Sequence, residues 1–140
     1  MKVEFKNDCE GVKWEQVHTL LKDAGMATYP TEVLQKAFER SYAVVFLLKD
    51  ERIIGSGRAI SDGAYQAALY DFAVLPEYQG RGLGHQISNA ILERVGHCNI
   101  ILYASPGKEL FYERFSFRRM RTGMARFIKQ DAMQQKGFIE

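Results

Sequence analysis

Residues 69–84 read LYDFAVLPEYQGRGLG, an almost continuous apolar run followed by a proline and three alternating glycines. Apolar and aromatic residues fill Ala67–Leu75, which favours a buried strand interrupted only by Asp71. Pro76 lacks the backbone N–H that a central strand needs, so the strand is expected to stop there. The stretch therefore predicts a strand, a short turn and then a helix.

The glycines of the turn indicate an anion site. Without side chains at Gly80, Gly82 and Gly84, several backbone N–H groups can point at the space before a helix that begins near Leu83. These donors and the positive end of the helix dipole suit a phosphate. The alternative, glycines that only allow close packing, is disfavoured because three such residues cost conformational entropy.

Two well-known glycine motifs do not fit this turn. A dinucleotide fingerprint would need a glycine where His85 stands, and a P-loop would need a Gly-Lys-Ser/Thr ending that is absent. Residues 79–84, QGRGLG, instead resemble the acetyl-CoA motif Q/R-x-x-G-x-G/A of the GCN5-related N-acetyltransferase (GNAT) superfamily. Their position after an apolar strand ending in V-x-P strengthens the resemblance.

Composition limits the function classes. A length of 140 residues suits one domain, so we predict a single N-acetyltransferase domain over residues 1–140. The formal net charge of +2 is too small to favour nucleic acid as a partner. No apolar run is long enough for a membrane span and no signal-peptide pattern is present, so a cytoplasmic location is expected. Cys9 and Cys98 form no metal or redox motif, and no metal is expected.

The first half of the chain predicts one strand and two helices. Val3–Lys6 reads as a short strand. Apolar residues at helical spacing from Trp14 onward stop at Gly25, a glycine of the kind that ends helices. A second helix is expected after Pro30, with Thr31 as its N-cap.

The resemblance assigns this helix pair to one wall of the acceptor pocket. It implies that Met26, Tyr29 and Phe38 contact the substrate. Packing of the same side chains in the core or at its rim is an equally weighted alternative.

A hairpin follows. Ala43–Lys49 and Arg52–Ile60 are apolar segments joined by the polar turn Asp50-Glu51. Gly55 and Gly57 weaken the second segment, which suggests a bulge or a close approach of backbone to ligand.

The last third predicts a strand at Asn99–Ala104 and a helix at Lys108–Phe115, with Ser105 as cap and Pro106 in the first turn. Alternating residues suggest one or two closing strands within Arg118–Lys129. The polar tail after them is expected to be an exposed segment.

A second motif lies on the predicted last helix. Residues 111–117, FYERFSF, look like the family signature F-Y-x-x-x-G-F. In that family the tyrosine, here Tyr112, lies beside the coenzyme A sulfur and can protonate the departing thiolate. A phenol pKa of ~10 and a thiol pKa of ~8.5 are close enough for this role. The alternative is structural packing of the tyrosine. Ser116 and Ser105 replace the family's usual glycine and asparagine.

The resemblance implies an α/β (α+β) fold of the acyl-CoA N-acyltransferase type. A mixed, mostly antiparallel sheet would be flanked by roughly four helices and would splay into a V between its fourth and fifth strands. Acetyl-CoA would be the co-substrate in this gap. The residues implied to bind it are Phe72, Ala73, Val74, Gln79, Gly80, Arg81, Gly82, Leu83, Gly84, Ser105, Phe111 and Tyr112.

Asp71 is the carboxylate inside the central strand. Such a group should be paired or raised in pKa, so it is a candidate general base or amine anchor, weighed evenly against a structural role. A water chain to solvent is a third route for the amine proton. Histone-directed members place a glutamate earlier on this strand, where Ala67–Leu69 stand here, and this disfavours a histone acceptor.

Three functions remain open at this point. The favoured one is acetyl transfer from acetyl-CoA to a small-molecule amine by direct attack in a ternary complex. The alternatives are a protein or peptide N-acetyltransferase and a non-catalytic acyl-CoA-binding module. Dimers are common in the superfamily, so a homodimer stays open.

Overall fold

The computed structural model describes residues 2–140, and these form two compact units that divide between Leu102 and Tyr103. The first unit carries the sheet and the glycine turn. The second carries the predicted tyrosine motif. A single domain over residues 1–140 stays a prediction.

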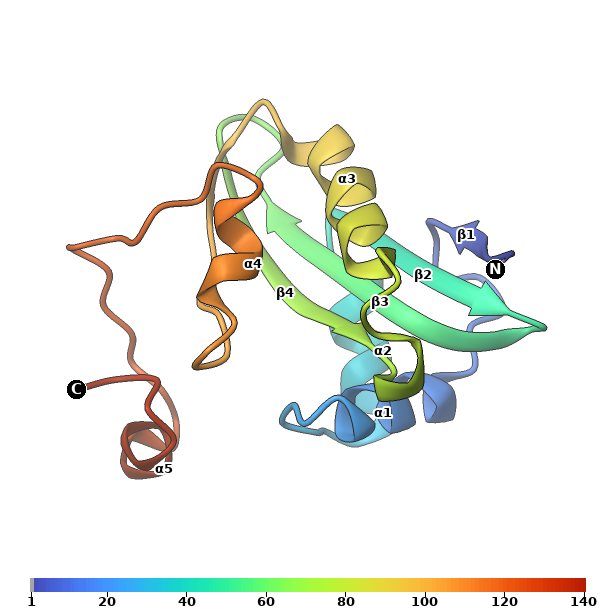
Figure 1. Cartoon of the computed structure of the whole chain (residues 1–140), viewed down its shortest axis with the longest axis horizontal. Coiled ribbons are helices and arrows are strands. Elements are labelled where there is room, and N and C mark those ends of the chain that lie inside the picture. The colour runs from blue at the N-terminus through green and yellow to red at the C-terminus, as the bar shows by residue number, and fades with distance from the viewer. Residues whose placement is uncertain (1) are drawn as a thin grey trace. The chain divides into compact units, whose positions relative to one another are not determined.

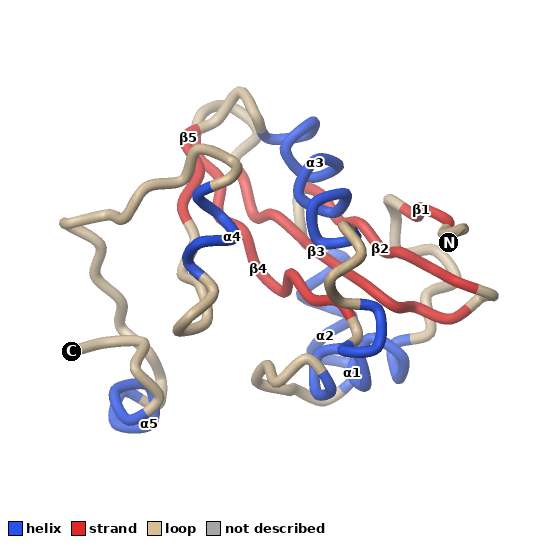
Figure 2. Tube along the Cα trace, viewed as in Figure 1, coloured by secondary structure: helices blue, strands red, loops and turns tan. Residues whose placement is uncertain are grey.

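The first unit is a five-stranded sheet in the order β1-β2-β3-β4-β5. All neighbouring strands are antiparallel except β4 and β5, which are parallel, so the expected mixed, mostly antiparallel sheet is confirmed. Its elements are β1 (Glu4–Lys6), α1 (Trp14–Asp23), α2 (Thr31–Glu39), β2 (Ala43–Lys49), β3 (Arg52–Ser61), β4 (Gln66–Val74), η1 (Pro76–Tyr78), α3 (Leu83–Val95) and β5 (Asn99–Ile101). Figure 1 labels its α-helices and its strands except β5, which is labelled in Figure 2.

Helices cover both faces of this sheet. Gly57 and Arg58 are neighbours on β3, so they point to opposite faces. Gly57 lies against Ile87 of α3, whereas the Arg58 guanidinium lies over the ring of Phe38 of α2. Helix α3 therefore packs on one face and α2 on the other.

An aromatic cluster forms part of the core on the α1–α2 side. The ring of Phe38 lies 5.7 Å from that of Trp14 and 5.4 Å from that of Phe46, between ring centres. All three residues are buried. Because each large ring removes much apolar area from water, this cluster fixes α1 and α2 on the sheet.

The predicted hairpin is confirmed. Strands β2 and β3 pair from Lys49↔Arg52 to Ala43↔Ala59. Asp50 and Glu51 both have positive φ, 51° and 64°, as a two-residue type I′ turn requires.

The predicted bulge is confirmed in β3, where Leu47 pairs with Gly55 and Leu48 with Ile53, so that Ile54 is the extra residue. A second bulge lies on the neighbouring strand β4. Ser56 pairs with Ala73 and Arg58 with Tyr70, so Gly57 alone faces two residues of β4. One of these, Asp71, has a φ of 56°. The bulge of β3 lies beside Gly55, as the sequence indicated, and Gly57 provides space for the bulge that β4 makes.

Replacing Gly57 with alanine should destabilise the first unit. A Cβ there would lie 2.7 Å from Ile87 Cγ2 and 3.0 Å from the Phe72 ring. Because Ile87 is buried, the overpacking should lower the free energy of unfolding by about 1–3 kcal/mol. Gly123→Ala is the control, since its Cβ would make only ordinary contacts. Chemical denaturation measures both, and equal stability of Gly57→Ala and the parent would contradict the packing described here.

Strand β4 is paired fully on one side only. On the other side, β5 pairs with Gln66–Ala68, and within residues 2–140 no strand continues the ladder toward Val74. This partial pairing is the expected separation of the fourth and fifth strands. It leaves the end of β4 next to the glycine turn as a sheet edge.

The second unit contains two short helices, α4 (Glu109–Glu113) and α5 (Gln130–Gln135). The predicted closing strands within Arg118–Lys129 are wrong: this segment is loop in Figure 2. Met124 and Ile128 are almost fully exposed there, so their alternation has no sheet to pack on. The tail is mostly exposed, with Ala132, Met133, Phe138 and Ile139 half-buried, and it contains α5.

Two predicted caps are also wrong. Pro30, with ψ of 152°, occupies the N-cap of α2, and Thr31 is already helical. The helix expected after Ser105 begins later, because Lys108 N–H donates to the Ser105 carbonyl at 2.9 Å and closes a turn. Gly107, with φ of 89°, stands in that turn. A Pro-Gly pair at its centre is typical of a type II turn.

Candidate functional site

The turn after β4 leaves its backbone open. Gly80 and Gly82 have φ values of 78° and 82°, a left-handed conformation that glycine adopts without strain. A Cβ built at either position would have no atom within 4 Å. The space in front of these glycines is therefore open to a ligand, and packing does not explain their presence.

Helix α3 begins directly after this open turn. Gly82 is its N-cap and supplies no side-chain hydrogen bond, and the first turn carries no acidic residue. The first-turn N–H groups of an α-helix have no partners within the helix, and the helix dipole makes this end positive. The turn and the helix start thus combine open space, amide donors and positive potential, as an anionic group requires.

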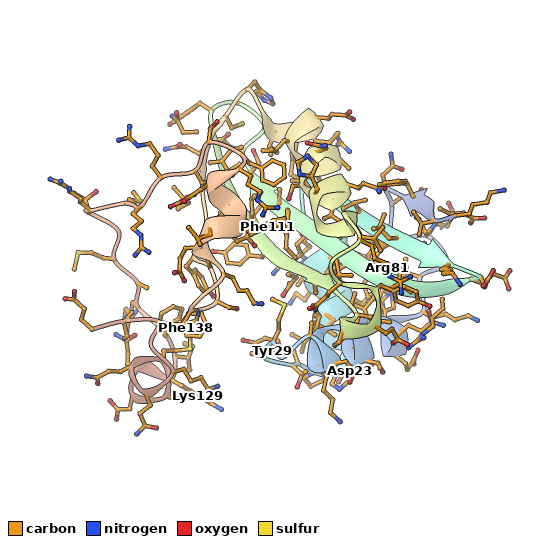
Figure 3. The ribbon with its side chains drawn as sticks, viewed as in Figure 1. Asp23, Tyr29, Arg81, Phe111, Lys129 and Phe138 are labelled. Atoms are coloured by element: carbon orange, nitrogen blue, oxygen red, sulfur yellow. The ribbon has the colours of Figure 1, made fainter. Side chains whose placement is uncertain are left out.

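Side chains on both sides fix the turn. Gln79 Nε2 donates to the Val74 carbonyl at 2.9 Å, so the turn is tied to the end of β4. The Arg81 guanidinium lies over the ring of Tyr78, 5.6 Å from its centre. Arg81, labelled in Figure 3, brings a cation to the exposed surface of the turn. Leu83 is buried and anchors the start of α3.

The predicted coenzyme strand adjoins this turn. Phe72, Ala73 and Val74 form the last residues of β4, on the sheet edge that β5 does not reach. An extended ligand with amide groups can pair with such an edge as an added strand would. The sheet edge and the anion site therefore form one continuous surface.

Asp71 is held in an ion pair. Its Oδ2 accepts a hydrogen bond from Arg58 Nε at 2.6 Å, and the two side chains are only 21% and 13% exposed. An acceptor oxygen already bound by a guanidinium is less available to take a proton from an amine. The contact favours the structural role of Asp71, and its role as a base stays a prediction.

The three predicted acceptor contacts differ in exposure. Phe38 is buried in the aromatic cluster, which supports the packing alternative for it. Met26 is half-buried and Tyr29 is 56% exposed, so both side chains can reach a ligand. The Tyr29 carbonyl lies 3.0 Å from His18 Nδ1, which ties this loop to α1. Figure 3 labels Tyr29 on that loop.

A depression of about 260 Å³ lies elsewhere on the first unit. It is lined by Glu15, Gln16, Thr19, Leu20, Arg52, Ile53 and Leu75. None of the residues predicted to bind coenzyme or acceptor lines it. One of its lining residues, Leu75, directly follows β4 in the sequence.

The tyrosine motif folds as a short helix in the second unit. Tyr112 lies on α4 between two aromatic neighbours, with ring centres 5.1 Å from Phe111 and 6.0 Å from Phe117. Burial raises the pKa of the Tyr112 phenol above its ordinary value of 10.0. The phenol therefore stays protonated at neutral pH, while the same shift makes it a weaker acid toward a thiolate.

Ser116 takes the conformation of the glycine that it replaces. Its φ is 69°, and Phe117 N–H donates to the Tyr112 carbonyl at 3.3 Å, which closes the helix end. Ser116→Gly should therefore raise the free energy of unfolding by about 1 kcal/mol. Thermal unfolding measures this change. Ser105→Gly is the control, because Ser105 has no positive φ, and it should not stabilise; an unstabilised Ser116→Gly would contradict the strain assigned here.

Sequence reasoning missed Arg58. This arginine stands within an otherwise apolar strand and pairs with Asp71, yet it was not predicted as a site residue. A signal was present, since a charged side chain in a covered strand needs a partner of opposite charge.

Two searches of the described residues concern other kinds of site. No group of three or more histidine, cysteine or acidic side chains in residues 2–140 is arranged to hold a metal ion. Over the same residues, no helix is both long and apolar enough to cross a membrane.

Comparisons with known proteins agree on one family. A family model described as an acetyltransferase (GNAT) domain matches residues 12–132. The chain is 28% identical over 118 residues to GCN5-related N-acetyltransferase 1, chloroplastic, of Arabidopsis thaliana; the match covers 81% of this chain and 60% of the relative. It is 32% identical over 117 residues to a Glycine max protein named histone acetyltransferase TAP1. This match covers 72% of this chain and 50% of the relative.

A solved structure shows the same fold. A Staphylococcus aureus protein superposes with a TM-score of 0.83 at 27% identity, covering 91% of this chain and 99% of the other. The two plant relatives are longer, since the matches span only 60% and 50% of their lengths.

Proposed function

Because the chain belongs to the acetyltransferase (GNAT) family, we propose that it transfers the acetyl group of acetyl-CoA to a primary amine of a small-molecule acceptor. One observation carries the proposal: the open, left-handed turn at Gly80 and Gly82 in front of the uncapped α3. A side chain at either glycine would fill this space. The turn therefore fits the pyrophosphate of coenzyme A.

The chain's backbone would hold and orient the coenzyme. Amide groups of residues 81–84 bind the pyrophosphate, and the edge of β4 at Phe72, Ala73 and Val74 pairs with the pantetheine arm. Val74 N–H donates to the thioester carbonyl oxygen. Bound acetyl-CoA supplies an activated acetyl group. Orientation and a donor aimed at developing negative charge would then provide much of the rate.

Side chains complete the proposed arrangement. Tyr112 donates its phenolic proton to the coenzyme sulfur as the thiolate leaves, and solvent water reprotonates the phenolate. Its raised pKa means that the phenol is protonated when the reaction begins. Phe111 and Ser105, which lie near Tyr112 in the sequence, are also proposed to contact the coenzyme. The amine proton leaves to solvent water, because Asp71 Oδ2 is bound to Arg58.

The acceptor class is the finer part of the proposal. Ala67 and Leu69 are buried apolar residues at the place where histone-directed members carry a glutamate, which supports a small-molecule amine. Met26 and Tyr29 offer partly exposed apolar surface for it. A protein or peptide acceptor is the second candidate, since a relative 32% identical to this chain is named a histone acetyltransferase.

The remaining partners are proposals from the sequence. We expect no nucleic acid and no membrane partner. A homodimer is proposed because dimers are common in the superfamily. A cytoplasmic location likewise stays a prediction, although the Arabidopsis relative is named chloroplastic.

Acetyl transfer tests the function directly. The purified chain is incubated with acetyl-CoA and a panel of small primary amines, with lysine peptides in parallel. We expect thiol release and a mass gain of one acetyl group on a small amine, and neither with its N,N-dimethylated counterpart. Transfer to peptides alone would favour the second candidate. Coenzyme binding without any transfer would favour a non-catalytic acyl-CoA-binding module.

A further inference from the structure

A largely buried charged pair joins the two central strands of the first unit. Arg58 of β3 donates from Nε to Asp71 Oδ2 of β4 at 2.6 Å, with side-chain exposures of 13% and 21%. Charges removed from water in this way depend on each other, because losing one partner leaves the other uncompensated. The pair is therefore more than a surface salt bridge.

The arginine is itself held rigidly. Its guanidinium lies over two rings, 5.5 Å from the centre of Phe38 and 5.3 Å from that of Tyr70. A second nitrogen, Nη1, donates to Ser41 Oγ at 3.3 Å. Arg58 contacts two rings and donates hydrogen bonds from two nitrogens. This combination depends on the planar guanidinium of arginine, which lysine lacks.

The partner of Arg58 is the strained residue of the bulge. Asp71 has a φ of 56°, an uncommon conformation for a residue other than glycine. Its carbonyl accepts a hydrogen bond from Ser56 Oγ at 2.9 Å, while its carboxylate is bound by Arg58. Ser56 and Arg58 stand two apart on β3 and share one face. Two side chains of β3 thus bind Asp71, one at its backbone carbonyl and one at its carboxylate.

The bulge lies directly before the predicted coenzyme strand. Phe72, Ala73 and Val74 follow Asp71 without interruption, so the bulge decides the direction in which their backbone groups point. We infer that Arg58 is a positioning residue, which fixes the β4 bulge through Asp71 and so aims the backbone donors of residues 72–74. The inference rests on the proposed function, and Arg58 itself touches no reacting group.

Kinetics separate positioning from general stability. Arg58→Met removes the charge and the fork but keeps an apolar chain. Misplacing a donor by a fraction of an ångström to one ångström should lower kcat up to about 100-fold. The dissociation constant for coenzyme A should change much less than kcat, because the glycine turn is untouched and only the contacts of residues 72–74 with the pantetheine arm shift. Arg58→Lys should lie between the parent and Arg58→Met.

A second variant and a double-mutant cycle distinguish a positioning effect from misfolding of Arg58→Met. Asp71→Asn keeps the size of the side chain and removes its charge. If both residues act as one unit, the double variant should lose no more kcat than the worse single variant. Arg94→Met is the matched control, since Arg94 also lies over a ring, 5.6 Å from that of Tyr42, but has no link to Asp71.

Amide hydrogen exchange provides a readout that needs no activity. In Arg58→Met and Asp71→Asn, the amides that bond β4 to β3 on either side of the bulge should exchange about tenfold faster or more, while those of α1 stay near the parent. Unchanged exchange of these β3–β4 amides in both variants would overturn the inference, whether or not the parent is active. So would an active parent whose folded Arg58→Met variant keeps its full kcat. Failure of the parent to transfer acetyl groups would count against the proposed function alone.

Discussion

Replacing Tyr112 with phenylalanine is expected to lower kcat about 100-fold and to leave coenzyme affinity nearly unchanged. The variant keeps the ring that packs between Phe111 and Phe117 and loses only the hydroxyl. General acids usually contribute ~10²–10⁴-fold, and the lower end applies here because a thiolate is a comparatively good leaving group. Initial rates with a fixed amine and varied acetyl-CoA measure the effect.

The pH dependence follows from the direction of the pKa shift. Burial raises the pKa of Tyr112 above 10.0, so the phenol keeps its proton throughout the neutral and mildly alkaline range. A decline in kcat caused by Tyr112 should therefore begin only above about pH 10. In Tyr112→Phe, that alkaline decline should disappear together with most of the rate.

Tyr65→Phe is the matched control for this prediction. Tyr65 is 63% exposed and outside both motifs, so its variant should keep the parent's kcat. Full activity in Tyr112→Phe would show that the hydroxyl donates no proton in the rate-limiting step. The structural alternative for this tyrosine would then hold.

Changing Gly80 and Gly82 together to valine should weaken acetyl-CoA binding by roughly 100-fold or more. Each hydrogen bond from a backbone N–H to a charged phosphate contributes about 1.5–3 kcal/mol, and about 1.4 kcal/mol corresponds to tenfold in affinity. Two valine side chains would occupy the open space and would shift the backbone from its positive φ. Isothermal titration calorimetry gives the dissociation constants.

Gly11→Val separates strain from ligand exclusion. Gly11 also has a positive φ, 70°, and no atom within 4 Å of its Cβ position, but it lies outside the glycine turn. Its variant should lose stability and keep coenzyme affinity. If the turn variant bound acetyl-CoA as tightly as the parent, the ligand would not lie against these glycines.

The strand, turn and helix from residue 67 onward could be predicted because their signals are local. Pro76 ends the strand, the glycines release the turn, and the apolar stripe of α3 follows at helical spacing. The hairpin of β2 and β3 was equally local. In each case neighbouring residues in sequence decide the structure, and no distant contact overrides them.

Tertiary contacts account for what the sequence did not show. A bulge was expected from Gly55 and Gly57 and is present in β3, but the second bulge, on β4, depends on how Asp71 lies opposite Gly57. The helix after Ser105 starts late because a Pro-Gly turn competes with the serine cap. The alternation of apolar and polar residues in Arg118–Lys129 is typical of strands. Such a segment forms a strand only where it can pair with a sheet edge and pack its apolar side chains on an apolar surface.

The candidate site was predicted better than its supporting residues. The glycine turn and the edge of β4 were found from sequence because backbone requirements leave a clear pattern. Arg58 was missed although its charge in an apolar strand signalled the need for a partner, because only the fold shows that this partner is Asp71. The burial of Phe38 likewise depends on α1, α2 and β2 coming together.

Titration of the intact chain with acetyl-CoA by calorimetry tests the central claim most directly. The account predicts saturable binding of one coenzyme per chain with a dissociation constant on the order of micromolar. Coenzyme A without its acetyl group should bind comparably, because the proposed phosphate contacts are the same. No saturable heat with either ligand, from protein shown to be folded, would contradict the coenzyme site and the acetyl transfer proposed from it.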